Sequence, residues 1–210
     1  MHVKKSFWGI VFILTLITCS AMVSADTAAD YIENGNTLVH KKKYAEAIEQ
    51  YQKAAKKEPK NAQVPLLMGL CYAQLGDLDK GLHYTEWASQ NAPSYTSFYD
   101  LGLIYSARGE SEKALQAFDR ASTMNPKSFV LEYQKGLVYA TLKKYAQAIP
   151  FYQKALALNP SFDDARIALV GAFLNQGNRT SALAEIETFR KMKKNAVVRS
   201  LEARMKKSNP

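Results

Sequence analysis

The side chains that most often carry chemistry are sparse in this 210-residue chain. Beyond Ala25 it has two histidines, His40 and His83, and one cysteine, Cys71. A metalloprotease-type site needs two histidines one helical turn apart, and a phosphate-binding loop needs paired glycines followed by lysine. Neither pattern occurs, and the G-x-S-x-G turn that presents a nucleophilic serine is also missing. We therefore expect no enzyme activity, no metal site and no cofactor.

The remaining candidates have simpler structural explanations. Asp163 and Asp164 form a carboxylate pair, but they open an expected helix, where acidic side chains cap free N–H groups and interact with the helix dipole. His83 lies among apolar and aromatic residues and is expected to be a packing or surface residue. Cys71 lies in an apolar segment and is expected to be a small buried side chain.

The segment Met1–Ala25 has the three parts of a secretory signal peptide. Lys4 and Lys5 form a basic start, an apolar run extends from Phe7 to about Ile17, and Val23-Ser24-Ala25 is a small-x-small cleavage pattern. The apolar run is shorter than the roughly 18–20 residues that span a bilayer. We expect the segment 1–25 to be removed and the protein to be exported to the periplasm.

A second form of export stays open. Leu16-Ile17-Thr18-Cys19 resembles a bacterial lipoprotein signal, in which Cys19 would be lipidated and become the first mature residue. This alternative predicts a membrane-anchored lipoprotein. Cleavage after Ala25 would instead leave Cys71 as the single cysteine, which cannot form an intramolecular disulfide.

The net charge of +9 is concentrated at the two ends of the chain. Residues 26–189 carry 18 basic and 18 acidic residues, whereas residues 190–207 carry eight Lys or Arg and one acid, Glu202. The body therefore lacks the basic surface typical of nucleic-acid binding. The C-terminal segment is either the solvated face of a helix or a site of peripheral contact with anionic lipid or an acidic partner.

A repeat of about 34 residues organises the rest of the chain. KYAEAIEQYQKA at Lys43–Ala54 recurs as KYAQAIPFYQKA at Lys144–Ala155. Glycines and prolines recur with the same spacings of 34, 33 and 34, at Gly35, Gly69, Gly102 and Gly136 and at Pro59, Pro93, Pro126 and Pro160. Each unit is predicted to form two amphipathic helices, and proline ends the second because it cannot continue a helix.

This pattern resembles the tetratricopeptide repeat (TPR). The third unit matches best, with Phe98, Leu101, Gly102, Tyr105, Gly109, Ala114, Phe118, Ala121 and Pro126. The resemblance implies an all-α, right-handed superhelical solenoid of helix-turn-helix units. We place five repeats within residues 26–196, at about 28–61, 62–94, 95–128, 129–162 and 163–196.

The fifth repeat is degenerate, because Val170 occupies the glycine position and no proline closes the unit. Residues 197–210 are assigned to a basic capping helix and tail, the helix beginning at about Ala196. Such a cap covers the end of a repeat array. Its apolar residues recur at helical spacing and are Val197, Val198, Leu201 and Met205.

The resemblance also implies a concave groove lined by the first helix of each unit. Its second, fifth, sixth, ninth and twelfth positions are expected to be exposed. The candidate partner-binding residues at these positions are Asn36, Leu66, Leu70, Tyr99, Leu103, Tyr133 and Leu137, and the polar residues Asp100 and Gln134 occupy sixth positions. A groove this apolar and aromatic suits an amphipathic or extended peptide.

One subclass of TPR proteins binds a terminal carboxylate of its partner through Lys, Asn and Arg. Here Ile32, Leu67 and Thr96 occupy corresponding positions, and only Asn36 is kept. We therefore expect no chaperone-type clamp.

Two functions stay open, and neither involves nucleic acid. The first is an exported scaffold that holds a protein or peptide partner in the groove, in the assembly of pili, secretion machinery or other envelope complexes. The second is a factor docked to a membrane or an acidic partner through the C-terminal basic segment. If Cys19 is lipidated, this factor would be a lipoprotein. The identity of the partner and the pathway does not follow from the sequence.

Overall fold

The computed structural model describes residues 26–192 and 194–207, and the expected signal peptide lies outside them. Within the described residues the chain forms eleven α-helices and no β-strand. They are α2 (Ala28–His40), α3 (Tyr44–Lys57), α4 (Gln63–Gln74), α5 (Leu78–Asn91), α6 (Tyr95–Ala107), α7 (Ser111–Met124), α8 (Phe129–Thr141), α9 (Tyr145–Leu158), α10 (Asp163–Asn175), α11 (Arg179–Lys191) and α12 (Asn195–Lys207). None of these helices has the length and apolar character needed to cross a bilayer.

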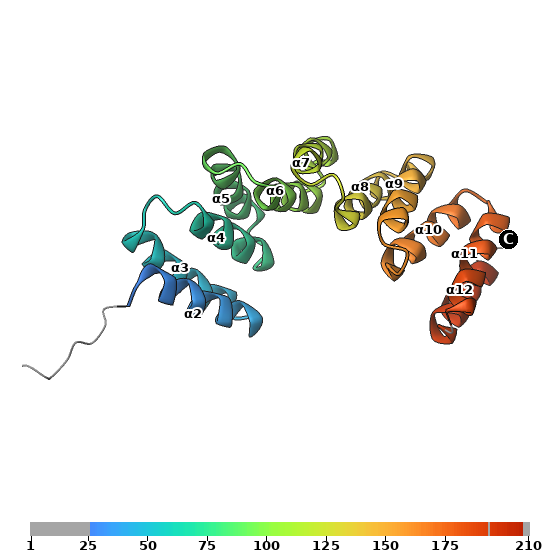
Figure 1. The fold of residues 1–210 in the computed structure, drawn as a ribbon, viewed down its shortest axis with the longest axis horizontal. Helices are drawn as coiled ribbons and strands as arrows, with labels where there is room; N and C mark the ends of the chain where they lie inside the picture. Colours follow the sequence, from blue (N-terminus) through green and yellow to red (C-terminus); the bar gives the residue numbers. More distant parts are fainter. Residues whose placement is uncertain (1–25, 193, 208–210) are drawn as a thin grey trace, which may run out of the picture.

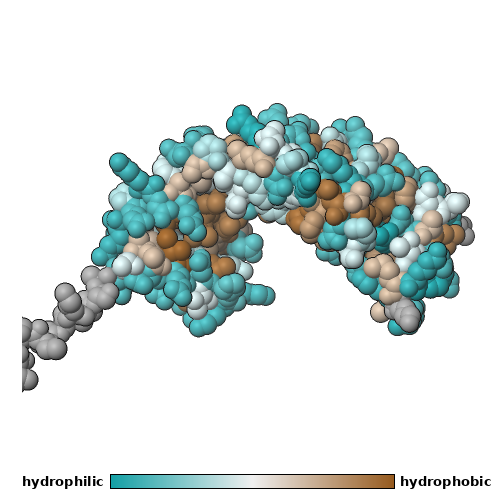
Figure 2. All heavy atoms as spheres, viewed as in Figure 1, coloured by the Kyte–Doolittle hydropathy of each residue, from teal (hydrophilic) through white to brown (hydrophobic). Residues whose placement is uncertain are grey.

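The helices form five consecutive pairs followed by a single helix, and together they build an arch (Figure 1). Each helix packs on its neighbours in sequence, and α4 contacts α6, α6 contacts α8 and α8 contacts α10. The first helices of successive units therefore lie side by side. Figure 2 shows hydrophobic side chains gathered on the inner side of the arch, over α4 and α5 and again over α8 to α10. The expected all-α solenoid is confirmed.

Close packing inside three of the pairs depends on a glycine that faces an aromatic ring. A Cβ atom added to the glycine would lie less than 3.0 Å from ring carbons in the pairs Gly35–Tyr51, Gly102–Phe118 and Gly136–Tyr152. The three rings are almost completely buried. Glycine lets the two helices approach until the ring of the second helix touches the backbone of the first.

The second unit is built differently, because Thr85 stands where the other units have the ring. The Thr85 hydroxyl donates to the Gly81 carbonyl oxygen at 2.7 Å. A Cβ atom on Gly69 would lie 3.0 Å from that same oxygen. Helices α4 and α5 are thus in close backbone contact, with Thr85 and not an aromatic ring against the glycine.

The turn inside every unit has one residue with a left-handed backbone. It is Gly76, Gly109 and Gly177 in three units, with φ of 85°, 78° and 73°, and Lys42 and Lys143 in the other two, with φ of 58° and 57°. Non-glycine residues adopt this conformation at some cost. Because the fifth pair has the same turn, its degenerate sequence still encodes the helix-turn-helix geometry.

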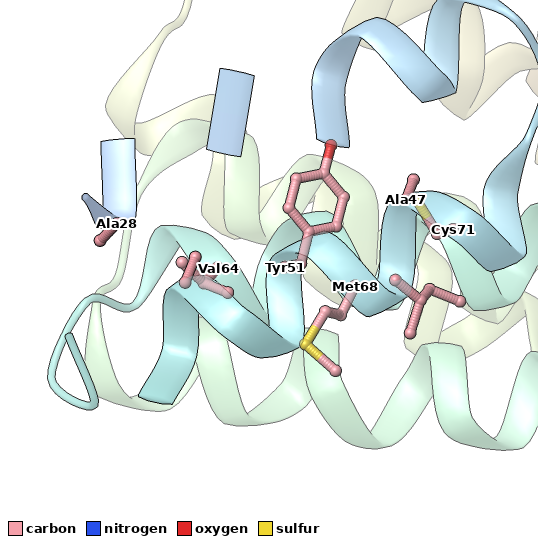
Figure 3. Packing of buried hydrophobic residues seen from close by; sticks show 8 residues of the cluster. Ala28, Ala47, Tyr51, Val64, Met68 and Cys71 are labelled. Atoms are coloured by element: carbon pink, nitrogen blue, oxygen red, sulfur yellow. The ribbon is translucent and has the colours of Figure 1, made fainter. Parts of the chain in front are cut away.

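The hydrophobic core extends along the arch as four clusters instead of one centre. Figure 3 shows the first cluster, in which Ala28 of α2 and Tyr51 of α3 lie near Val64 and Met68 of α4. Cys71 belongs to this cluster and is 2% exposed, so the expectation of a buried cysteine is confirmed. Burial raises the pKa of its thiol to about 11, which keeps it protonated and unreactive.

Helix α12 covers the end of the array through an apolar stripe. Val198, Leu201 and Met205 are buried against a cluster that includes Ile186 and Phe189. Part of the basic segment is neutralised here, because Arg190 pairs with Glu202 at 2.6 Å and Lys194 pairs with Asp163.

The expectation that Asp163 and Asp164 cap a helix is wrong. They are the first two residues of α10, but the N-cap is Phe162, and no side chain caps this end. Asp163 instead forms the ion pair with Lys194. Both carboxylates still lie in the first turn, where the helix dipole favours negative charge.

Candidate functional site

All seven candidate partner-binding residues lie on the first helices of their units, and all are half-buried. The expectation of freely exposed side chains is therefore wrong in degree, because adjacent first helices pack against one another and cover part of each side chain. Asp100, at the sixth position of its repeat, differs most from the expected exposure, because it is only 6% exposed. The inner face is accordingly a row of shallow pockets separated by packed side chains.

The first pocket, of about 260 Å³, lies where α2, α3 and α4 meet. Its lining includes Asn36, Tyr51, Leu67 and Leu70. The Tyr51 hydroxyl donates to Asn36 Oδ1 at 2.8 Å, and burial raises the pKa of Tyr51 to about 12, so the hydroxyl stays a donor. This bond orients the Asn36 amide and leaves its N–H₂ group able to donate to the carbonyl of a bound peptide.

The second pocket adjoins the first and is the larger, at about 490 Å³. We call it the Asp100 pocket. It is bounded by α4, the end of α5 and the start of α6, and its lining residues are Ala62, Gln63, Leu66, Leu67, Leu70, Ala88, Ala92, Pro93, Ser94, Thr96, Ser97 and Asp100. Leu67 and Leu70 line both pockets, so the two pockets adjoin along α4.

Tyr99 and Leu103 pack against the core of the third unit. The Tyr99 ring stacks on Tyr95 with centroids 5.7 Å apart, and Gln134 Nε2 donates to its hydroxyl at 3.5 Å. Tyr99 therefore supports the fold, and it lines neither of the two pockets above. Any substitution there needs a control for stability.

A third pocket, of about 280 Å³, lies over the fourth and fifth units. Tyr133 and Leu137 line it together with Asp164, Asn175 and Arg204 of α12. Sequence reasoning missed Arg204, because a capping helix is expected to present its basic side chains to solvent. The repeat pattern carries no signal for it, because α12 lies outside the repeats.

Five of the seven candidate residues thus line two binding areas, whereas Tyr99 and Leu103 line none of the three pockets and pack in the region between them. Asn36, Leu66 and Leu70 meet at the first two pockets, whereas Tyr133 and Leu137 meet at the third. His40 and His83 are exposed. The described part of the chain holds no group of three or more His, Cys, Asp or Glu side chains that could bind a metal ion.

Stacked helix pairs with a pocketed inner face define an α-solenoid repeat protein, a class that binds other proteins along an extended surface. Three family models match the chain: "TPR repeat" at residues 35–76 and "Tetratricopeptide repeat" at residues 95–128 and 130–162. Together they cover about half of the sequence. The chain is a tetratricopeptide repeat protein.

Curated relatives include an Hsp70-Hsp90 organizing protein of Triticum aestivum, 32% identical over 95 residues. A similar protein of Arabidopsis thaliana, Hsp70-Hsp90 organizing protein 3, is 31% identical over 96 residues. The matches cover 45% of this chain but only 16% and 17% of these relatives. The similarity is thus confined to a small part of the larger proteins.

Solved structures resemble the chain over most of its length. A MamA protein is 25% identical, covering 80% of this chain and 93% of its own, with a TM-score of 0.69. A thermophilic TPR protein of Thermus thermophilus is 22% identical, with coverages of 87% and 98% and a TM-score of 0.66. YrrB, described as a TPR protein with an unusual peptide-binding site, is 19% identical, with coverages of 84% and 92% and a TM-score of 0.65. The last two comparisons concern the fold alone.

Proposed function

We propose that this protein is an exported, non-catalytic scaffold that binds a segment of a partner protein along the inner face of the arch. The observation that carries the proposal is the pair of adjoining pockets over α2 to α6, which combine leucine walls with an oriented amide at Asn36 and a carboxylate at Asp100. Apolar side-chain pockets beside a few placed polar groups are typical of sites that hold a peptide.

The relatives support the binding of protein partners. Their name states that Hsp70-Hsp90 organizing proteins organise two other proteins. Of the residues that form a terminal-carboxylate clamp in one subclass of TPR proteins, this chain keeps only Asn36. Leu67 and Thr96, at two of the clamp positions, instead line the Asp100 pocket. We therefore propose recognition through internal side chains of the partner, in an envelope, pilus or secretion assembly.

Site-specific crosslinking tests where the partner binds. A photoreactive amino acid is placed at Leu70 or Leu137 in the groove, or at Gln116 on α7, which lines a separate surface pocket with Lys113. The full-length chain is expressed in its native host and irradiated. We expect the same partner to be captured from both groove positions and not from Gln116. Capture from Gln116 alone would contradict a groove-bound partner.

A matched pair of double variants measures the contribution of the groove tyrosines. Tyr99→Ala with Tyr133→Ala removes two rings at the expected groove positions of α6 and α8, and Tyr105→Ala with Tyr139→Ala removes two rings further along the same helices. Tyr105 bonds Glu86 of α5 and Tyr139 stacks on Phe151, so the control pair lies away from the groove. We expect the first pair to weaken partner capture at least about tenfold, corresponding to roughly 1.4 kcal/mol. If both double variants keep the same helicity and lose partner capture equally, the loss is explained by lower stability and not by the groove rings.

Export is tested by fractionation of the native host and by determination of the mature N-terminus. We expect the protein in the periplasmic fraction with Asp26 as its first residue. A first residue of Cys19 carrying a diacylglycerol group would instead support the lipoprotein alternative. A cytoplasmic protein that retains the segment 1–25 would contradict export.

A second candidate function is docking to an anionic surface through α11 and α12. It is favoured by the exposed side chains of Lys191, Arg199 and Lys206. It is weakened by the ion pairs that already engage Arg190 and Lys194. Binding to vesicles of phosphatidylglycerol that disappears at raised salt and after Arg199→Ala with Lys206→Ala would favour this function.

A further inference from the structure

Asp100 is the single charged residue among the described residues that line the Asp100 pocket. It lies on α6 and is 6% exposed. Its Oδ2 atom is enclosed, and no hydrogen-bond donor in the described part of the chain reaches it. Burial alone raises the pKa of this carboxyl to about 7, with no contribution from a neighbouring positive charge.

The buried Glu132 shows how the same fold compensates a buried carboxylate elsewhere. Glu132 is 2% exposed, and Lys154 Nζ donates to its Oε1 at 2.7 Å. An uncompensated buried carboxylate is costly, because desolvation of the charge is not offset by attraction or hydrogen bonds. Asp100 therefore differs from Glu132 in lacking a cation within the described part of the chain, although it borders a pocket large enough to admit one.

The shape and chemistry of the pocket indicate which cation would fit. Leu66, Leu67 and Leu70 form an apolar wall of the kind that accommodates the methylene stem of a lysine. Gln63 and Thr96 provide further oxygen atoms around the pocket. Because Oδ2 is enclosed, a guanidinium could not bond both carboxylate oxygens, which is the arrangement that favours arginine. An ammonium acts as a point charge and needs one accessible oxygen.

From these features we infer that the Asp100 pocket binds a lysine side chain of the partner segment, with the ammonium on the Asp100 carboxylate and the stem against the leucines of α4. This inference rests on the proposed function, because it concerns the residue that the groove selects. It predicts that partner segments share a lysine at one register, flanked by apolar residues that reach the neighbouring pocket near Asn36.

Peptide selection tests the inference directly. The full-length chain selects binders from a random library of short peptides held between fixed flanks, so that no free amino terminus can occupy the pocket. Each enriched peptide is synthesised with an acetylated amino terminus, once with lysine and once with norleucine, which keeps the stem but not the charge. Both forms are titrated against the wild type, Asp100→Asn and the control Glu112→Gln, which removes an exposed carboxylate of α7 outside the three pockets.

We expect lysine at one register in the enriched peptides. Replacing it by norleucine should weaken binding about 10- to 100-fold for the wild type and for Glu112→Gln. For Asp100→Asn the affinities of the lysine and norleucine peptides should differ by less than about twofold, because the neutral amide offers no charge to the ammonium. Thermal unfolding of Asp100→Asn confirms that the variant is folded.

The outcomes separate the inference from the function on which it rests. Peptides that bind the groove without a lysine requirement, or whose lysine effect persists in Asp100→Asn, would overturn the lysine pocket and leave groove binding intact. Failure to enrich any peptide would count against both proposals.

Discussion

The variant Phe118→Ala is expected to lower the free energy of unfolding by about 3–5 kcal/mol. The Phe118 ring is 0% exposed and fills the space between α6 and α7 next to Gly102. Truncation removes its buried apolar surface and leaves a cavity that the packed helices cannot fill. Urea-induced unfolding followed by circular dichroism measures the loss. Trp87→Ala serves as the control, since Trp87 is 37% exposed and its truncation should cost far less.

A second substitution tests whether the ring acts through its contact with the glycine. In the wild-type background, Gly102→Ala should destabilise by about 1–3 kcal/mol, because the new Cβ atom collides with the ring. In the Phe118→Ala background the collision is absent, and the higher helix propensity of alanine should make the same change neutral or stabilising. An equal cost of Gly102→Ala in both backgrounds would show that helix packing in this unit does not depend on the glycine–ring contact.

The architecture could be predicted from the sequence because its determinants are local and repeated. Gly102 and Phe118 belong to one unit, and their positions recur in the first and fourth units as Gly35 with Tyr51 and Gly136 with Tyr152. Spacing alone therefore indicates which residues meet. The expected capping helix beginning at about Ala196 corresponds to α12, Asn195–Lys207, because its apolar spacing is itself helical.

The candidate site could be predicted only in part, because it depends on contacts between units. The pattern placed Leu66 and Leu70 on a common face, but it could not give the depth of a pocket bounded by three helices. It treated Asp100 as an exposed groove residue, although packing of α4 beside α6 buries it. It also missed Arg204, which reaches the third pocket from a helix outside the repeats.

The packing of the second unit also could not be predicted from the repeat pattern. Thr85 in place of a ring was visible in the sequence, but its consequence was not. The hydroxyl bonds the Gly81 carbonyl, and α4 lies in close backbone contact with α5. The spacing of glycines and prolines is unchanged there, so the repeat pattern alone gives no sign that this unit packs by backbone contact.

The variant Asp100→Asn is expected to be more stable than the wild type above pH 7, and the advantage should depend on pH. The pKa of Asp100 is about 7 in the folded protein, against about 3.9 for an aspartate in an unfolded chain. The folded state therefore holds a proton that the unfolded state has already released between these values. The stability contributed by this proton is fully present below about pH 4 and is lost as the pH rises from there through 7.

Asparagine resembles the protonated acid and never ionises, so the variant should escape this loss. The free energy of unfolding of Asp100→Asn minus that of the wild type should rise by about 3 kcal/mol between pH 5 and pH 8, at roughly 1.4 kcal/mol for each pH unit below the folded-state pKa. Urea titrations of both proteins at three pH values measure this difference. The control Asp164→Asn removes one negative charge from an exposed position of the inner face. It therefore separates the effect of burying the charge on stability from the effect of changing the net charge.

A difference that stays flat across this range would mean that the Asp100 carboxylate is compensated in the free protein, and the case for a cation-binding pocket would lose its electrostatic basis. A rising difference would mean that the free protein keeps an acidic group at a cost to its own stability. A lysine-containing peptide should then stabilise the wild type more strongly at pH 8 than at pH 5, because its ammonium requires the ionised carboxylate. The same peptide should stabilise Asp100→Asn equally at both pH values, which links the stability measurement to recognition of the partner.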